Sequence, residues 1–314
     1  MNLQDSTVFV TGGSGFLGSH IVDSLRQRGA RVLAPERKQL DLLNRTAVDS
    51  FLREYRPEVV VHAAACIGGI GFTRTHPGTT FYENILMNTQ MMEACRLAGV
   101  EKFVGIGSVC AYPKTLPLPF SEDDLWLGYP EETNAPYGLA KKMMLVQAQA
   151  YRQEFGFNAV HLLMVNMYGP RDKFDPRWSH VIPALMRKCL EAKEHGAPVV
   201  EVWGDGSPTR EFLYVGDAAE AVVLATERYD SSEPVNIGSG EEISIRELAV
   251  LIAELTGFEG EFSWQTQQPN GQPRRILDVS RAQREFGFKA RIPLREGLQK
   301  TLDWYVKNRE QVVR

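Results

Sequence analysis

Short apolar runs alternate with amphipathic stretches through the first half of the chain. The runs that predict strands lie at residues 7–10, 31–34, 58–64 and 102–108. Stretches with helical periodicity separate them, so the pattern predicts βαβ units and an α/β fold. We expect a Rossmann-type doubly wound parallel sheet with helices on both faces. Ligands of such sheets bind beside the carboxyl ends of the strands, and we expect the functional site there.

The second half of the chain is less regular. A long segment rich in proline, acidic and aromatic residues, 111–136, predicts an ordered loop before a helix that starts near Pro136. A strand at 159–165 follows. We predict a dinucleotide-binding Rossmann domain over 1–166 and a smaller α/β substrate-binding domain over 167–314. A segment near 211–238 is expected to return to the first domain.

Charge and cysteine content narrow the classes of partner. The 314 residues include 35 basic and 39 acidic ones, which give a net charge of −4 and no basic tract. We therefore expect neither nucleic acid nor membranes as partners. The four cysteines lie far apart, which predicts reduced thiols and not disulfides or a zinc site. No segment offers the roughly 20 apolar residues of a membrane span, and we expect a cytoplasmic protein.

A glycine-rich turn directly follows the first predicted strand. Gly12, Gly15 and Gly18 form a GxxGxxG pattern at the start of a helix. Glycines at these positions let the backbone approach a pyrophosphate, which the helix N-terminus attracts. A tight turn without a ligand is the alternative, but the strand and helix context favours dinucleotide binding. We expect Gly12, Gly15, Phe16, Leu17 and Gly18 to contact the cofactor.

The residues at the end of the second predicted strand are expected to discriminate between NAD and NADP. An acidic residue there binds the ribose hydroxyl of NAD, whereas a basic residue accepts the extra phosphate of NADP. Glu36 is followed by Arg37 and Lys38, so NADP(H) is favoured and NAD(H) stays possible. Arg37 and Lys38 are alternatively an ordinary solvated loop. Asp41 is expected either at the adenine edge or as a cap of the next helix.

Tyr137 and Lys141 lie four residues apart near the start of a predicted helix and share one face. A nearby ammonium stabilises phenolate, so we expect Lys141 to lower the pKa of Tyr137 and make it a general acid or base. Ser108 ends the fourth predicted strand, at the sheet edge of the glycine turn. Asn166 is expected to close the next strand. Alone, the Tyr–Lys pair would be an ordinary surface pair.

Together these motifs resemble the extended short-chain dehydrogenase/reductases, which act mostly on nucleotide-activated sugars. Within that superfamily the chain is most similar to the GDP-L-fucose synthase family. Segments in chain order carry the likeness: AACIGGI (64–70), GSVCAYPK (107–114), TNAPYGLAKK (133–142), NMYGPRDKF (166–174), SHVIPAL (179–185), WGDGSPTREFLYVGD (203–217) and NGQPRRILD (270–278). The glycine and YxxxK motifs mark only the superfamily, whereas the segments around YPK, SHVIPAL and PRRxLD are more specific.

The resemblance implies a catalytic serine, tyrosine and lysine at Ser108, Tyr137 and Lys141. It implies that Cys110 and His180 carry out epimerisation beside a 4-keto group, which acidifies the hydrogens at C3 and C5. Histidine titrates near neutrality, and the surroundings of a cysteine can bring it there. Without the resemblance, Cys110 would be a buried structural cysteine and His180 a helix cap or a solvated residue. His62, His76 and His161 are expected to be structural.

The resemblance also implies binding residues. It places Ala64 and Asn166, with Tyr137 and Lys141, at the cofactor, and Arg210, Lys188 and Trp203 at the nucleotide diphosphate sugar, with a GDP-sugar favoured. An arginine fork suits a diphosphate, although a salt bridge between the domains is the alternative for Arg210. It further implies a homodimer built on helices at 81–98 and 137–154.

The chain departs from the family pattern in the glycine turn, where Ser14 and Phe16 flank Gly15 in place of a basic residue. The alternative function is therefore another NAD(P)-dependent nucleotide-sugar 4-epimerase or 4-reductase, without 3,5-epimerisation. A non-catalytic nucleotide-binding regulator is disfavoured, because a binding module has no need of a lysine-paired tyrosine.

Overall fold

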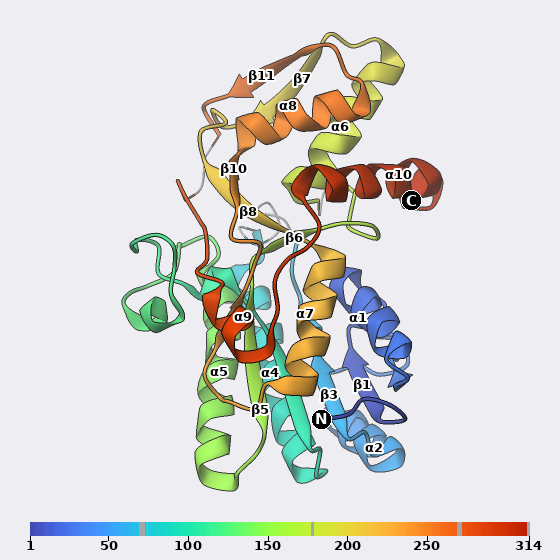
Figure 1. Ribbon diagram of the computed structural model, residues 1–314, viewed down its shortest axis with the longest axis vertical. Coiled ribbons are helices and arrows are strands. Elements are labelled where there is room, and N and C mark those ends of the chain that lie inside the picture. The colour runs from blue at the N-terminus through green and yellow to red at the C-terminus, as the bar shows by residue number, and fades with distance from the viewer. Residues whose placement is uncertain (69–72, 74, 177–178, 269–271, 313–314) are drawn as a thin grey trace.

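The computed structural model describes residues 1–68, 73, 75–176, 179–268 and 272–312. A six-stranded sheet in the order β2-β1-β3-β4-β5-β9 forms the larger part of the molecule (Figure 1). All of its neighbouring strands are parallel, which confirms the predicted fold class. The strands are β1 (Thr7–Thr11), β2 (Arg31–Leu33), β3 (Val59–His62), β4 (Lys102–Ser108), β5 (Ala159–Met164) and β9 (Val235–Ile237).

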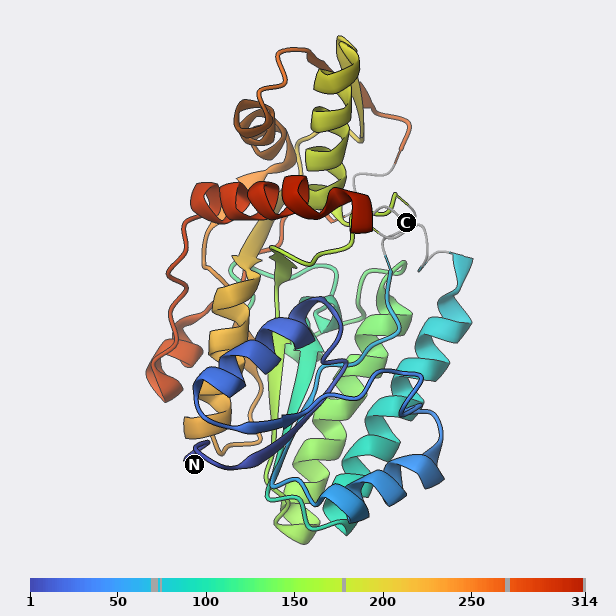
Figure 2. The ribbon, with the colours of Figure 1, turned by 90° about the vertical axis from the view of Figure 1, so that its right-hand side faces the viewer.

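Two layers of helices cover this sheet, one on each face (Figure 2). Strand alternation explains both layers: Val8 and Val10 of β1 join the core under one layer, and Phe9 joins the core under the other. On the first face lie α1 (Phe16–Gln27) and α7 (Val215–Arg228). On the second lie α2 (Arg45–Tyr55), α4 (Pro77–Leu97) and α5 (Ala135–Phe155).

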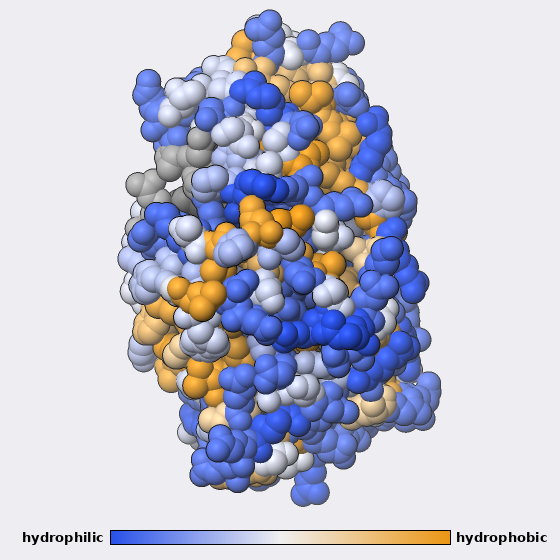
Figure 3. Space-filling view, turned by 60° about the vertical axis from the view of Figure 1, so that its left-hand side comes forward, coloured by the Kyte–Doolittle hydropathy of each residue, from blue (hydrophilic) through white to orange (hydrophobic). Residues whose placement is uncertain are grey.

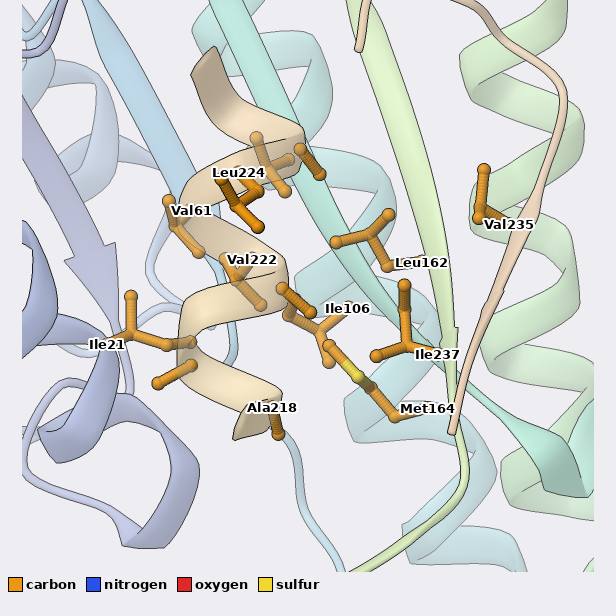
Figure 4. Packing of buried hydrophobic residues seen from close by; sticks show 14 of the residues in the cluster. Ile21, Val61, Ile106, Leu162, Met164, Ala218, Val222, Leu224, Val235 and Ile237 are labelled. Carbon is orange, nitrogen blue, oxygen red and sulfur yellow. The ribbon is translucent and has the colours of Figure 1, made fainter. Parts of the chain in front are cut away.

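The helix α7 is the main apolar cover of the first face. Its Val222 and Leu224 belong to the same apolar core as Ile106 and Leu162 of the sheet, and Val222 lies close to Ile106 (Figure 4). Strands buried on both faces need near-continuous apolar sequence, which the valine-rich runs supply. Because this helix comes from the second half of the chain, the sheet is completed only when distant segments meet.

A smaller part stands beyond the carboxyl ends of the large sheet and has its own apolar core, which includes Ile182, Leu248 and Leu302. Its sheets contain three strands in the order β10-β8-β6 and two strands, β11-β7. The strands are β6 (Asn166–Tyr168), β7 (Val199–Trp203), β8 (Thr209–Tyr214), β10 (Glu242–Ser244) and β11 (Glu261–Gln265). The helices are α6 (Val181–His195), α8 (Ile245–Thr256) and α10 (Leu294–Val312).

The chain passes between the two parts more than once. α7 and β9 pack with the large sheet, and so does the short helix α9 (Ser280–Phe286), whose Phe286 lies in the same core as Val235. This arrangement supports the division at residue 166 with a return near 211–238, which stays a prediction. Within the described residues, no helix is both long and apolar enough to cross a membrane.

One boundary differs from the sequence-based expectation. Asn166 does not close a strand, because β5 ends at Met164 and Asn166 opens β6. There its side-chain amide donates to the carbonyl oxygen of Glu211 on β8, at 3.2 Å. The apolar pattern runs on through Val165, but the chain changes its pairing partner from β4 to β8, which local sequence does not reveal.

Candidate active site

The glycine turn lies where the strand order of the large sheet reverses, since β2 and β3 flank β1 on opposite sides. Gly12 has φ +68°, and a Cβ there would lie 2.9 Å from the Cα of Ala64. The backbone N–H of Ala64 donates to the Thr11 hydroxyl oxygen at 3.2 Å. The structure thus brings Gly12 and Ala64 together, whereas Gly69 and Ile70 of the same motif lie outside the described residues.

The first helix begins at this turn with its N–H groups free of side-chain capping. Its N-cap is Gly15, which makes no side-chain cap bond. A Cβ on Gly18 would lie 2.0 Å from the Gly12 carbonyl oxygen, so only glycine allows α1 to approach so closely. Leu17 is buried in the core, so only its backbone can face a ligand. Uncapped N–H donors at a glycine-lined helix N-terminus fit a dinucleotide diphosphate.

The loop after β2 places the two residues expected beside the adenosine. Arg37 is exposed, and no hydrogen bond or ion pair to a described residue holds its side chain, which fits a phosphate ligand. The Asp41 carboxylate accepts a hydrogen bond from the N–H of Leu43 at 3.1 Å. The cap of α2 is Asn44, whose side chain accepts from the N–H of Ala47. Of the two alternatives for Asp41, the helix cap is therefore wrong, and its place at the adenine edge stays a prediction.

Ser108, Tyr137 and Lys141 converge at the carboxyl end of β4. Ser108 is the last residue of β4, and α5 begins at Ala135, so Tyr137 and Lys141 lie in its first two turns. The Lys141 Nζ lies 5.9 Å from the centre of the Tyr137 ring. Tyr137 and Lys141 are buried, with 7% and 1% of their surfaces exposed. The Ser108 hydroxyl accepts a hydrogen bond from the Cys110 N–H at 3.2 Å and lies near enough to the Tyr137 phenol to affect its pKa.

Burial sets the protonation of this group, and it corrects one expectation. Loss of hydration raises the pKa of Tyr137, nearby Cys110 raises it further, and the hydrogen bond from Ser108 only partly opposes them. The expectation that Lys141 lowers this pKa is therefore wrong, because desolvation dominates. Burial also lowers the pKa of Lys141 to about 8. The structure thus holds Tyr137 as a neutral phenol, the form that can give a proton.

A buried polar network fixes α5 against the sheet, and sequence reasoning missed its role. The His62 ring contacts the Thr11 hydroxyl at 2.8 Å and the Asn88 side chain at 3.1 Å. Asn88 in turn donates to the carbonyl oxygen of Ala140, next to Lys141, at 3.1 Å. Burial lowers the pKa of His62 to about 3, with the Lys141 ammonium adding to the effect. Neutral His62 therefore links the strand that leads into the glycine turn to α5.

Cys110 lies in a short 3-10 turn, η1 (Val109–Ala111), directly after Ser108. A Cβ on Gly138 would lie 2.1 Å from the Cys110 carbonyl oxygen, so α5 packs directly on this turn. The Arg275 Nη1 lies 3.8 Å from the Cys110 sulfur. Burial lowers the pKa of Arg210 to about 10, with Arg275 adding to that shift and Cys110 opposing it. The structure therefore groups Cys110 with two arginines.

Sequence reasoning did not single out Arg275, although it lies in the PRRxLD segment that contributes to the family resemblance. Its place in that segment is the feature of the sequence that could have pointed to Arg275. The first two residues of the longer stretch, Asn270 and Gly271, lie outside the described residues.

His180 precedes α6 and is exposed, but its side chain makes no capping hydrogen bond. The helix-cap alternative is therefore wrong. Protein around the ring lowers the pKa of His180 by desolvation, and the charge of Lys173 adds to this. Among the described residues, no contact joins His180 to Cys110 or Tyr137, so its catalytic role stays a prediction.

The three expected substrate residues lie in different settings. Arg210 lies on β8, donates to the Thr209 carbonyl oxygen at 2.7 Å and is close to Cys110. The Lys188 Nζ on α6 donates to the carbonyl oxygen of Glu201 at 2.7 Å. Trp203 ends β7 with 61% of its surface exposed. Of the three, Arg210 is the one whose pKa is affected by the nearby Cys110.

Comparison with known proteins agrees with this geometry. The chain is 42% identical, over 98% of its length and 95% of the relative's, to a protein of Arabidopsis thaliana named GDP-L-fucose synthase 1. A GDP-L-fucose synthetase from Naegleria fowleri, solved bound to NADP, superimposes with a TM-score of 0.89 at 28% identity, with coverage of 99% and 97%. A GDP-6-OMe-4-keto-L-xylo-heptose reductase from C. jejuni gives 0.90 at 28% identity, with coverage of 97% and 98%.

A family model covers the nucleotide-binding sheet together with the returning helix and strand. It matches residues 8–238, which contain the glycine turn, Ser108, Tyr137 and Lys141. With relatives of this identity over nearly the whole chain, the protein belongs to the NAD dependent epimerase/dehydratase family.

Proposed function

We propose that this protein converts GDP-4-keto-6-deoxy-D-mannose into GDP-L-fucose by 3,5-epimerisation and NADPH-dependent reduction of the 4-keto group. The observation that carries the proposal is the convergence of Ser108, Tyr137 and Lys141 with Cys110 at one end of β4, beside the glycine turn. Ser108, Tyr137 and Lys141 suit reduction of a ketone, and Cys110 suits proton exchange at a carbon beside the ketone.

Epimerisation needs a base on one face of the sugar and an acid on the other. The Cys110 thiolate takes a proton from the carbon beside the ketone, and the electron pair of that C–H bond moves onto the keto oxygen as an enolate. Protonated His180 returns a proton to the opposite face, which inverts the carbon. Since surrounding protein lowers the pKa of His180, the imidazolium gives up its proton readily.

Reduction uses the other three residues. A bound reduced nicotinamide supplies hydride to C4. Tyr137, neutral because burial raises its pKa, protonates the keto oxygen. The Ser108 hydroxyl orients that oxygen, and the Lys141 ammonium stabilises the negative charge that Tyr137 gains.

Binding follows from the charged and aromatic residues around this centre. The Arg37 side chain binds the extra phosphate of NADP(H). The choice of NADP(H) as cofactor agrees with the relative that was solved bound to NADP. Arg210 holds the diphosphate of the sugar nucleotide by a two-pronged contact. Lys188 and Trp203 are assigned to the diphosphate and the base.

The second candidate is a 4-reductase that performs no epimerisation. The specific observation in its favour is the likeness to a GDP-6-OMe-4-keto-L-xylo-heptose reductase from C. jejuni. In that case Cys110 or His180 is idle, and the Ser108, Tyr137 and Lys141 chemistry is unchanged.

The test follows NADPH absorbance with GDP-4-keto-6-deoxy-D-mannose in heavy water, with mass analysis of the product. We expect NADPH oxidation and deuterium at C3 and C5. A Cys110→Ser variant should lose deuterium uptake, whereas Cys95→Ser, altered at a buried cysteine in the apolar core under α4, should keep it. Oxidation without deuterium would establish the simple reductase, and no turnover would contradict the proposed function and favour an enzyme that acts on another nucleotide sugar.

We also propose a cytoplasmic homodimer. The four cysteines are free thiols, as expected in a reducing compartment. Apolar side chains gather at the lower left of Figure 3, and α4 and α5 expose Phe81, Tyr82 and Val146. Packing of these helices against a second copy would bury them. Light scattering should give a dimer mass, and Tyr82→Lys with Val146→Asp should give a monomer. A wild-type monomer would contradict this.

A further inference from the structure

The segment that follows the undescribed residues 269–271 is anchored firmly beside the site. The N–H of Leu277 donates to the buried carboxylate of Glu211 at 2.8 Å. The N–H of Phe120 donates to the Ile276 carbonyl oxygen at 2.9 Å, which joins this segment to the long loop after Cys110. Arg275 therefore projects from a firmly held stretch of backbone.

The side chain of Arg275 is held as well. It is 8% exposed, and its Nε and Nη2 donate to the Gln272 side-chain oxygen at 3.2 and 2.8 Å. Gln272 uses its amide to donate to the carbonyl oxygen of Lys114 at 2.8 Å. This leaves Nη1 directed at the Cys110 sulfur, 3.8 Å away.

The neighbouring arginine behaves differently. Arg274 forms an ion pair with Glu242 at the surface, where 54% of its side chain is exposed. The two consecutive arginines thus share charge and sequence position but differ in burial and partner. Of the two, Arg275 is the one that faces the cysteine.

We propose that Arg275 is a positioning residue for Cys110, with its guanidinium locked by Gln272 so that Nη1 orients the sulfur and stabilises the thiolate. This inference rests on the proposed role of Cys110 in epimerisation. A charge-assisted hydrogen bond favours the ionised form of its acceptor. When the thiolate takes a proton from the sugar, Arg275 stays charged and keeps the thiol aimed at the same carbon.

Other charged or titratable groups also face Cys110 among the described residues. These are Tyr137 from α5 and Arg210 from β8. Arg210 is assigned to the sugar nucleotide, so substrate diphosphate competes for its charge. The Arg275 guanidinium is held by Gln272 and so keeps its position beside the sulfur.

The test measures alkylation of Cys110 by iodoacetamide from pH 5.5 to 9.5, with mass analysis of its peptide, in the full-length protein without a sugar. Arg275→Gln should slow alkylation at pH 7 by about tenfold, as expected for a lost hydrogen bond to a charged group, and shift the profile to higher pH. Arg275→Lys should restore part of the rate. Arg274→Gln is the matched control and should behave like wild type.

An unchanged profile in folded Arg275→Gln, or an equal shift in Arg274→Gln, would overturn the proposal. Should Arg275→Gln fail to fold, Gln272→Ala replaces it, because it releases the guanidinium and should shift the profile in the same direction. Alkylation needs no sugar, so absent turnover with nucleotide sugars would count against the proposed function alone.

Discussion

The protonation states of Tyr137 and Lys141 are decided by how much hydration each side chain loses on burial. Tyr137 and Lys141 are both buried, and burial disfavours the charged form of each, so the phenol stays neutral and the ammonium is weakened. A neutral phenol, placed beside an ammonium whose pKa is lowered, is suited to protonating a ketone. Two experiments test these states.

Replacement of Tyr137 by phenylalanine removes the proton donor and keeps the ring in place. We expect NADPH oxidation to fall at least about 100-fold, the usual contribution of general acid catalysis, while deuterium uptake at C3 and C5 continues. Stopped-flow absorbance and mass analysis measure the two steps. As a control, Tyr112→Phe removes a buried phenol that bonds Asn236 at 2.7 Å and should cost stability, not hydride transfer. Equal loss of both steps in Tyr137→Phe would contradict separate roles.

The decline of the reaction rate at alkaline pH should follow the loss of the proton from the Lys141 ammonium. Its pKa is lowered to about 8 by burial, so the ammonium is present below that pH and is lost above it. We expect the rate of NADPH oxidation to decline as pH rises through about 8. In Lys141→Arg the charge persists to much higher pH, so the decline should move upward whatever the absolute rate. Identical profiles for the two proteins would exclude Lys141 as the titrating group.

At the scale of elements, the approach of α1 to β1 depends on glycine. A Cβ on Gly18 would overlap the Gly12 carbonyl oxygen at 2.0 Å, so the helix N-terminus can sit against the turn only without a side chain. The same approach aims the uncapped N–H groups of α1 at the expected diphosphate. Gly18 is therefore needed both for the packing of α1 and for the expected binding of the cofactor.

Gly18→Ala should lower the free energy of unfolding by about 1–3 kcal/mol, as overpacking does, and weaken NADPH binding. Urea unfolding and fluorescence titration measure the two effects. Gly78→Ala is the matched control: it lies in the first turn of α4, with no atom within 4 Å of the place its methyl group would take, and should leave stability equal or higher. Equal losses in both variants would contradict a steric origin.

Local sequence predicts the long elements better than the short ones. The helix expected from near Pro136 begins at Ala135 as α5, and the apolar run at 102–108 coincides with β4. The three-residue strands β6 and β10 escape prediction, because both pair with β8 and owe their extended form to that distant partner. Strand pairing of this kind is absent from any window of sequence.

At the scale of the whole molecule, neutral histidines are enclosed in the large sheet. His161 on β5 and His62 on β3 are fully buried, and desolvation together with the Lys141 charge lowers the pKa of each to about 3. Neither His161 ring nitrogen has a described partner, and its Nε2 lies 2.3 Å from where a Gly107 Cβ would be. In the folded protein, His161 and His62 therefore stay unprotonated until the pH falls to about 3.

This makes stability fall in acid. The unfolded chain protonates each histidine near pH 6.5 and the folded chain only near 3, so stability is complete above 6.5 and is lost below it. Each buried histidine costs about 1.4 kcal/mol per pH unit over that range. Urea unfolding of His161→Leu should therefore lose about 2 kcal/mol less than wild type between about pH 6.5 and 5.

The control for this experiment is His195→Gln, altered at an exposed histidine of α6, which should lose as much stability as wild type over the same interval. If His161→Leu shows the wild-type dependence on pH, the buried imidazole does not cause the loss.

Local patterns in the chain were enough to specify the parallel sheet, the glycine turn after β1, the place of Ser108 at the sheet edge and the shared helix face of Tyr137 and Lys141. Each depends on a short period, a turn or a spacing within one helix, and parallel strands bring their carboxyl ends together. The neutral state of Tyr137, the fixing of α5 by Asn88 and His62, and the approach of Arg275 to Cys110 from 165 residues away emerged only from the folded molecule. Burial and long-range contacts arise from packing, and packing is a property of the folded chain as a whole.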